Sequence, residues 1–252
     1  MTEPESDEID IMLRPATIVG RRMVVLATLC RRAFLESKQA SSELDDDPEG
    51  DRFDLRMWLH DHQLDDELIA EEVHVLETNA GDLSADDATA LSWNSEALAA
   101  LAWAVELAPA LPDPAQTVDP TNLLATIPAP WDDPRAWISS VMLREEFEIA
   151  SERERAEVWA WRAEVEDKRR QLPGQARRAL EADIAEVVRE ATAAGLLPKS
   201  TINDFVSGGR PVRELSDDQL DTLLANATIR LHALNWLCGF GTDWDDVPLE
   251  ID

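Results

Sequence analysis

Residues 231–252, LHALNWLCGFGTDWDDVPLEID, join an apolar helical run to a tail in which one Trp stands among three aspartates. Gly239 and Gly241 follow the apolar run, and glycine readily takes the positive φ that ends many helices. Aspartate side chains accept hydrogen bonds from backbone N–H groups in tight turns. We therefore predict that the tail folds back on the core as a C-terminal clasp, defined by Trp236, Gly239, Gly241 and Trp244.

Upstream of the clasp, the sequence carries helix signals at several points. Ser216, followed three residues later by Gln219, is a capping box that starts the final helix. Ser84 precedes a helix that runs to Pro109 with acids in its first turn. We find no alternating run of β-branched residues long enough to predict a strand. These patterns predict an all-α fold, a single irregular helical domain.

Two further helical regions have apolar stripes. In the first helix, which follows Pro15, apolar residues recur at three- and four-residue steps, and the arginines are expected to lie away from this stripe. These arginines are Arg21, Arg22, Arg31 and Arg32. A long helical region covers residues 132–172, with Phe147 on its apolar stripe and a break near Ala150.

The domain organisation follows from composition. Residues 1–13 are predicted to be a disordered acidic tail, because they bury too little to offset their ordering entropy. Residues 14–252 form the helical domain, within which residues 169–215 read as a helical insertion with a turn at Gly208 and Gly209. The acidic stretch 41–51 is predicted to be a loop.

Tryptophan is expected to be the main filler of a Trp-rich core. The chain has nine Trp and no Tyr, and Trp is normally placed where its ring is mostly buried and its N–H finds a partner.

The charge restricts the classes of partner. The formal net charge is −29, and the first 126 residues contribute −19 of it, from 8 basic and 27 acidic side chains. Phosphate backbones and anionic membranes require basic surfaces, so the charge argues against nucleic acid and membrane partners. A basic protein is the partner that this charge attracts, although a high negative charge also serves solubility alone.

The compartment is predicted to be the cytoplasm. Cys30 and Cys238 lie far apart in apolar helical runs without CxxC spacing, as small buried hydrophobes do. The first ten residues are acidic, unlike a secretory signal, and the most apolar stretch is too short to span a membrane.

Acidic residues give two metal-site hypotheses, both weaker than their structural alternatives. Asp243, Asp245 and Asp246 could offer oxygen ligands to Ca²⁺ or Mg²⁺, but their spacing is not that of a calcium loop. Glu71 and His74 match one half of a Glu-x-x-His di-metal motif, whose second half is missing. No metal or other cofactor is predicted.

A buried polar network is the other candidate site. Asn235 lies one turn after Leu231 on the inward face of the final helix, and a buried amide needs hydrogen-bond partners. Its predicted partners are the backbone of the tail or a polar group on the helix that carries Trp93 and Trp103, such as Glu96, with Arg230 or Arg144 completing the network. Such a network serves either the structure or a pocket for a small polar ligand.

Four segments resemble a known family. RRMVVLATLCRRAF, LSWNSEALAALAWAVEL, LREEFEIASERERAEVWAWRA and the closing HALNWLCGFGTDWDDVPLEID are similar, in order, to the bacterial domain-of-unknown-function family DUF4272. The resemblance covers residues 20–165 and 228–252, and it implies a fold family without an established activity. The chain has Asn94 where the family tends to place Arg, and its ending departs from the family's Asp-Thr pair.

Two functions remain open from the sequence. The favoured one is a non-catalytic module whose acidic surface binds a basic protein. The alternative is a hydrolase or a small-ligand-binding protein that uses the neighbourhood of Asn235 and Glu96, with or without a metal. The sequence carries no Walker loop, no GxGxxG and no GxSxG motif. The oligomeric state is not predicted.

Overall fold

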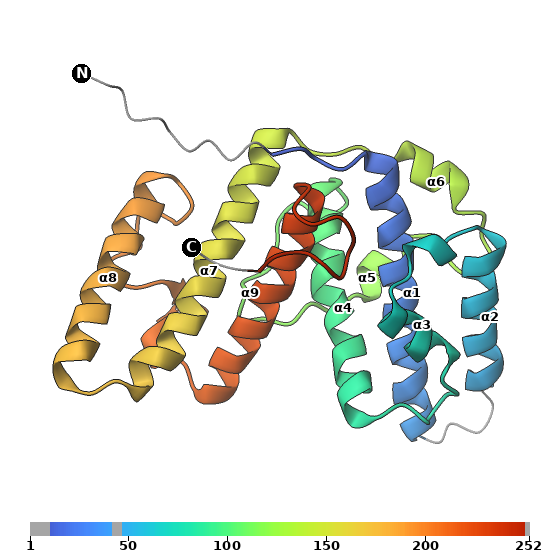
Figure 1. Cartoon of the computed structure of the whole chain (residues 1–252), viewed down its shortest axis with the longest axis horizontal. Coiled ribbons are helices and arrows are strands. Elements are labelled where there is room, and N and C mark those ends of the chain that lie inside the picture. The colour runs from blue at the N-terminus through green and yellow to red at the C-terminus, as the bar shows by residue number, and fades with distance from the viewer. Residues whose placement is uncertain (1–10, 42–46, 250–252) are drawn as a thin grey trace.

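The computed structural model describes residues 11–41 and 47–249, which fold into an all-α domain with one small hairpin (Figure 1). The helices and strands have the following bounds: α1 Ala16–Ser41, α2 Pro48–Asp61, η1 Asp65–Glu67, α3 Ala70–Glu77, α4 Ala85–Ala104, α5 Thr121–Leu124, α6 Arg135–Ser140, α7 Glu146–Gln171, α8 Gly174–Ala193, β1 Val206–Ser207, β2 Arg210–Pro211, η2 Val212–Glu214 and α9 Asp217–Leu237.

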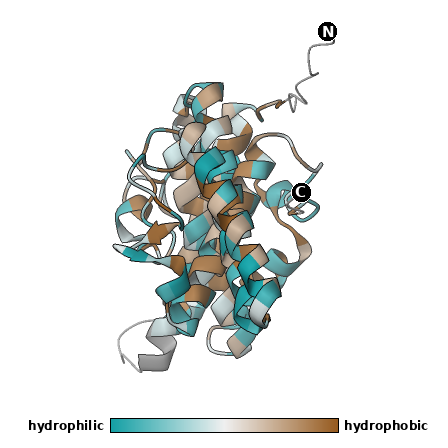
Figure 2. Ribbon diagram, turned by 90° about the vertical axis from the view of Figure 1, so that its left-hand side faces the viewer, coloured by the Kyte–Doolittle hydropathy of each residue, from teal (hydrophilic) through white to brown (hydrophobic). Residues whose placement is uncertain are grey.

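The long helices stand side by side in a fixed order. The final helix α9 packs against α7 on one side and α4 on the other, α4 packs against α1, and α1 contacts α2 and α6. The helix α8 lies outside α7, at the end of the molecule opposite α2 (Figure 1). Teal and brown residues occur along the same helices in Figure 2, as expected for helices that bury one side. No helix within the described ranges is long and apolar enough to cross a membrane.

Local capping explains where the main helices begin. The Ser84 side chain accepts a hydrogen bond from the backbone N–H of Asp87, and Ser216 and Gln219 form the predicted capping box of α9. One predicted loop is partly wrong, because α2 already starts at Pro48 within the stretch 41–51. Proline suits this first position, and the side chain of Asp47 caps the helix by accepting from Gly50.

The break in the long helical region lies earlier than predicted. The chain leaves the helix after Ser140 and re-enters it at Glu146, whereas Ala150 lies inside α7. Arg144 holds this extended link, because its backbone N–H donates to the carbonyl of Ala104 over 2.9 Å. Phe147, expected on the apolar stripe, is 82% exposed.

Two clusters of buried side chains support the fold. The main core lies between α1, α4, the first half of α7 and α9. The outer core joins the second half of α7 to α8, to Phe205 just before the hairpin, to η2 and to the start of α9. The predicted extra helix of residues 169–215 therefore packs in the outer core, while Gly208 and Gly209 form the exposed hairpin turn at positive φ. The two-residue strands of this hairpin were not predicted.

Aliphatic side chains, rather than tryptophans, make up most of the main core. Trp58, Trp103 and Trp236 are buried, whereas Trp131 is 85% exposed. The long apolar runs of α1 and α4 supply Leu, Val and Ala at close spacing, which fills the space between neighbouring helices. The prediction that Trp dominates the core is not confirmed.

The chain preceding α1 runs along the end of α9. The backbone N–H of Met12 donates to the carbonyl of Cys238 over 3.3 Å, and that of Arg14 donates to Leu237 over 2.9 Å. Ile11 and Leu13 pack on the main core. The acidic tail predicted for residues 1–13 otherwise falls on residues 1–10, which lie outside the described ranges.

Candidate functional site

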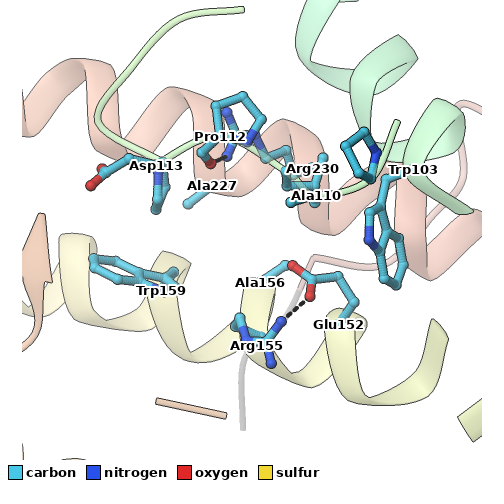
Figure 3. A pocket seen from close by; sticks show the side chains of 13 residues that line it. Trp103, Ala110, Pro112, Asp113, Glu152, Arg155, Ala156, Trp159, Ala227 and Arg230 are labelled. Carbon is cyan, nitrogen blue, oxygen red and sulfur yellow. Dashed lines mark hydrogen bonds and ion pairs between the residues drawn. The ribbon is translucent and has the colours of Figure 1, made fainter. Parts of the chain in front are cut away.

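A pocket of about 380 Å³ opens where α4, α7 and α9 meet the proline-rich loop that follows α4 (Figure 3). Each of these elements supplies part of its lining. The lining residues are Trp103, Pro109, Ala110, Leu111, Pro112, Asp113, Pro114, Glu152, Arg155, Ala156, Trp159, Ala227 and Arg230.

A buried ion pair holds the loop wall of this pocket. Nη2 of Arg230 lies 2.7 Å from Oε2 of Glu96, and both side chains are buried. Nη1 of Arg230 donates to the carbonyl of Pro112 over 2.7 Å, and Oε1 of Glu96 accepts from the backbone N–H of Val118 over 2.6 Å. The predicted contact between Glu96 and Arg230 is therefore present, and it fixes the loop to α4 and α9.

Two more polar side chains fasten the same loop. Nδ2 of Asn226 on α9 donates to the carbonyl of Pro114 over 2.8 Å. The carboxylate of Asp113 accepts from the backbone N–H of Gly208 over 2.8 Å and from the hydroxyl of Ser207. Through these hydrogen bonds Asp113 ties the loop to the hairpin, so its carboxylate has a structural role.

Charged groups stand at one edge of the pocket. Glu152 on α7 pairs with Arg155 one turn later (Figure 3). Nε of Arg155 also donates to the carbonyl of Leu196 over 2.9 Å. Burial raises the pKa of Glu152, and the positive charge of Arg155 opposes that shift. A carboxyl group in this setting can donate as well as accept hydrogen bonds near its pKa.

Aromatic rings bound the pocket at both ends. Trp103 and Trp159 stand on either side of Ala156 in Figure 3. Arg144 supports Trp103, because its guanidinium lies 5.0 Å from the ring centroid and its Nε donates to the carbonyl of Trp103 over 2.6 Å. Trp159 makes an edge contact with Phe205, with ring centroids 5.1 Å apart. Both rings are thus held in place from behind.

Asn235 contacts the tail backbone, which is one of its two predicted kinds of partner, and also Arg153, which was not predicted. Its Oδ1 accepts from Nε of Arg153 over 2.8 Å, and its Nδ2 donates to the carbonyl of Pro248 over 2.9 Å. Asn235 therefore joins α7 and the tail instead of contacting Glu96. Together with the contacts of Arg144, this separates the predicted network into distinct groups.

The C-terminal clasp packs on the main core. The ring centroid of Trp244 lies 4.0 Å from the guanidinium carbon of Arg22, 4.7 Å from the ring of His232 and 5.2 Å from that of Trp236. Burial is the largest cause that lowers the pKa of His232, and the charge of Arg22 acts in the same direction.

Both glycines of the clasp have positive φ, +86° for Gly239 and +76° for Gly241. Oδ1 of Asp246 accepts from the backbone N–H of Asp243 over 2.8 Å, which closes the turn after Gly241. Nε of Arg14 donates to the carbonyl of Trp236 over 2.7 Å and fastens the start of the chain to the same region.

The metal candidates do not form a coordination group. Among the described residues, no three His, Cys, Asp or Glu side chains lie close enough to hold a metal ion. Asp246 serves the turn of the clasp, while Asp243 and Asp245 are exposed. Glu71 and His74 are exposed on α3, and Nε2 of His74 lies 4.0 Å from Asp87.

The sequence prediction missed Glu152, Arg155, Ala156 and Trp159. Their spacing along α7 follows the helical repeat, which places them on one face. That pattern was visible in the sequence, but it does not show that the face borders a pocket.

Comparison with known proteins shows the family. The family described as domain of unknown function (DUF4272) matches residues 2–189, whereas the closing motif lies beyond the matched range. No curated protein and no solved structure matches the chain. The match covers well over half of the sequence, so the chain belongs to the DUF4272 family.

Proposed function

We propose that this protein binds a small molecule in the pocket between Trp103 and Trp159. The observation that carries the proposal is the combination of two braced aromatic walls with the Glu152–Arg155 pair at the pocket edge. Ligand sites commonly pair an apolar lining with a few placed polar groups. The buried Glu96–Arg230 pair supports it by holding the loop wall in position.

The lining indicates the kind of ligand. An apolar or aromatic body would lie over Ala156 between the two rings, and a polar head would reach Glu152 and Arg155. A volume of about 380 Å³ is at the small end of ligand pockets. The ligand is therefore a small amphiphilic molecule.

Binding is better supported than hydrolysis. The lining residues include no Ser, Thr or Cys that could act as a nucleophile and no His that could act as a general base. Glu152 is the lining group with a raised pKa, and the other lining acid, Asp113, is held by Ser207 and Gly208, so the two do not form a hydrolytic arrangement.

Ligand-observed NMR tests the proposal with benzoate, benzylamine and benzyl alcohol as probes. We expect the wild type to bind at least one probe, and Ala110→Trp, at an exposed position of the loop wall, to abolish binding. Ala156→Trp fills the pocket from the side of α7 and should abolish binding as well. Ala182→Trp, on the exposed face of α8, is the matched control and should bind like the wild type. Equal binding by the Ala110→Trp and Ala182→Trp proteins would exclude this pocket.

A second candidate function is the non-catalytic module that binds a basic protein in the cytoplasm. The net charge of −29 favours it, and so does an exposed Trp131 close to exposed acids. A reducing compartment suits the two buried free cysteines, whose pKa values burial raises to about 12. Binding of a labelled oligolysine should weaken steeply between about 0.05 and 0.5 M salt; the absence of binding at low salt would contradict it.

A further inference from the structure

A second hollow, of about 320 Å³, lies between α1, α2, α5 and the turn before α6. We call it the Trp131 groove. Its lining residues are Arg31, Leu35, Asp51, Asp54, Leu55, Leu124, Ala129, Pro130 and Trp131.

The groove has an apolar floor and an exposed aromatic wall. Leu35 and Leu55 are buried at its base, whereas the side chain of Trp131 is 85% exposed. A Trp as exposed as this contributes little to the stability of its own chain, and Trp is one of the residue types enriched among binding hot spots. The Trp131 ring is therefore placed to cover an apolar side chain that enters from outside.

Arg31, which lines the groove, has a buried donor without an acceptor within the described part of the chain. Nη2 of Arg31 donates to the carbonyls of Leu124 and Ile127 over 3.1 and 3.0 Å. Its Nη1 is buried and has no hydrogen-bond partner within the described part of the chain. Leaving such a donor unsatisfied costs free energy, so a carbonyl oxygen of an occupant would be stabilised there.

The negative charge at the rim of the groove indicates that the bound segment is positively charged. Asp51 and Asp54 are exposed on α2 beside the groove, and the first 126 residues carry a net charge of −19. Basic side chains that flank the entering residue would meet these carboxylates. The chain's own residues 1–10 contain five acids and no base, so their charge makes them a poor occupant.

We propose that the Trp131 groove docks a peptide segment of a partner protein in which an apolar side chain is flanked by Arg or Lys. The apolar side chain packs between Trp131 and Leu55, and a peptide carbonyl accepts from Arg31. The flanking bases pair with Asp51 and Asp54. This inference deepens the second candidate function, and it is independent of the pocket between Trp103 and Trp159.

Fluorescence anisotropy with three labelled peptides tests the groove on the full chain. One peptide carries a leucine flanked by arginines, the second replaces the leucine by alanine, and the third replaces the arginines by glutamates. We expect the first peptide to bind at least about tenfold more tightly than the other two, because both features contribute.

Variants then locate the binding. Trp131→Ala should weaken binding of the first peptide about tenfold or more. Asp51→Asn with Asp54→Asn should weaken it as well and reduce its salt dependence. The matched control, Asp183→Asn with Glu190→Gln, removes two exposed acids from α8, at the far end of the molecule, and should leave binding unchanged (Figure 1).

The outcomes separate the groove from the general acidic surface. If all variants bind the arginine-flanked peptides equally well, docking at the Trp131 groove is overturned, while the proposal that the acidic surface binds a basic protein stands. If neither these peptides nor oligolysine bind, both are overturned. A dimer in sedimentation experiments that Trp131→Ala dissociates would overturn the proposal in favour of a second copy of this chain.

Discussion

Glu96 and Arg230 lie 134 positions apart in the sequence and meet in a buried ion pair in which Nη2 of Arg230 lies 2.7 Å from Oε2 of Glu96. Glu96→Gln leaves the guanidinium buried with its charge uncompensated, so the free energy of unfolding should fall by about 3 to 5 kcal/mol. Urea unfolding followed by circular dichroism measures this.

Glu164→Gln is the control for that prediction. Glu164 pairs with Lys168 at 2.6 Å on the surface, where both side chains are about half exposed. Its replacement should change the free energy of unfolding by less than about 1 kcal/mol. Equal losses in the two variants would show that the buried pair has no special role.

Trp244 and Trp131 offer a matched pair of substitutions for the C-terminal clasp. Trp244→Ala removes the ring that contacts Arg22, His232 and Trp236, and should lower the free energy of unfolding by about 2 to 3 kcal/mol, given that the ring is partly buried. Trp131→Ala should change it by less than about 0.5 kcal/mol, because that side chain is exposed. Thermal unfolding compares the two, and a small loss for Trp244→Ala would contradict the clasp.

Gly239 should tolerate alanine less well than Gly195 does. Both have positive φ, but a Cβ at Gly239 would lie 2.5 Å from the carbonyl oxygen of Met12, whereas nothing lies within 4 Å at Gly195. Gly195→Ala should cost about 1 to 2 kcal/mol from the backbone conformation alone. Gly239→Ala should cost at least about 1 kcal/mol more, through overpacking. Similar unfolding midpoints in urea would contradict the close approach of the N-terminal segment.

His232 should make stability depend on pH. Burial lowers its folded-state pKa below the ordinary value of 6.5, so the unfolded chain takes up this proton first as the pH falls. Well above pH 6.5 His232 is neutral in both the folded and the unfolded chain, and the free energy of unfolding is not reduced. As the pH falls from 6.5 toward the folded-state pKa, the unfolded chain binds the proton and the free energy of unfolding decreases. Relative to His232→Phe, the wild type should therefore lose stability as the pH falls below the ordinary histidine pKa of 6.5. Parallel pH profiles of the two proteins would refute the assignment.

Helix starts were predictable because their signals are local. Ser84, Ser216 and Gln219 cap their helices through backbone groups only three residues away, and the same contacts form in the structure. The hairpin turn at Gly208 and Gly209 was located for the same reason, since a tight turn needs residues that accept positive φ.

The arginines of α1 were misplaced because their environment comes from elsewhere in the chain. Arg22 and Arg32 were expected away from the apolar stripe, yet both are buried. Arg22 pairs with Glu72 of α3, and Arg32 donates to the carbonyl of Val75 over 3.1 Å. Only the packing of α3 across α1 supplies these acceptors, and no spacing within α1 encodes it.

The candidate site was predictable in part. Glu96 was expected in one network with Arg230 or Arg144, and the structure pairs it with Arg230. For Asn235 the tail backbone was a correct prediction, but Arg153 takes the place of Glu96, since that choice depends on how α4 and α7 flank α9. Spacing on one helix gives the face of a residue but not the neighbour that covers it.

The sequence by itself determined the helical class, the main helix caps and the glycine-aspartate turn of the closing tail, because these depend on contacts within a few residues. The tertiary structure decided the pocket between Trp103 and Trp159, the Trp131 groove and the burial of charged side chains. Those features arise where segments far apart in the chain meet, and their geometry is set by packing between helices instead of by local propensity.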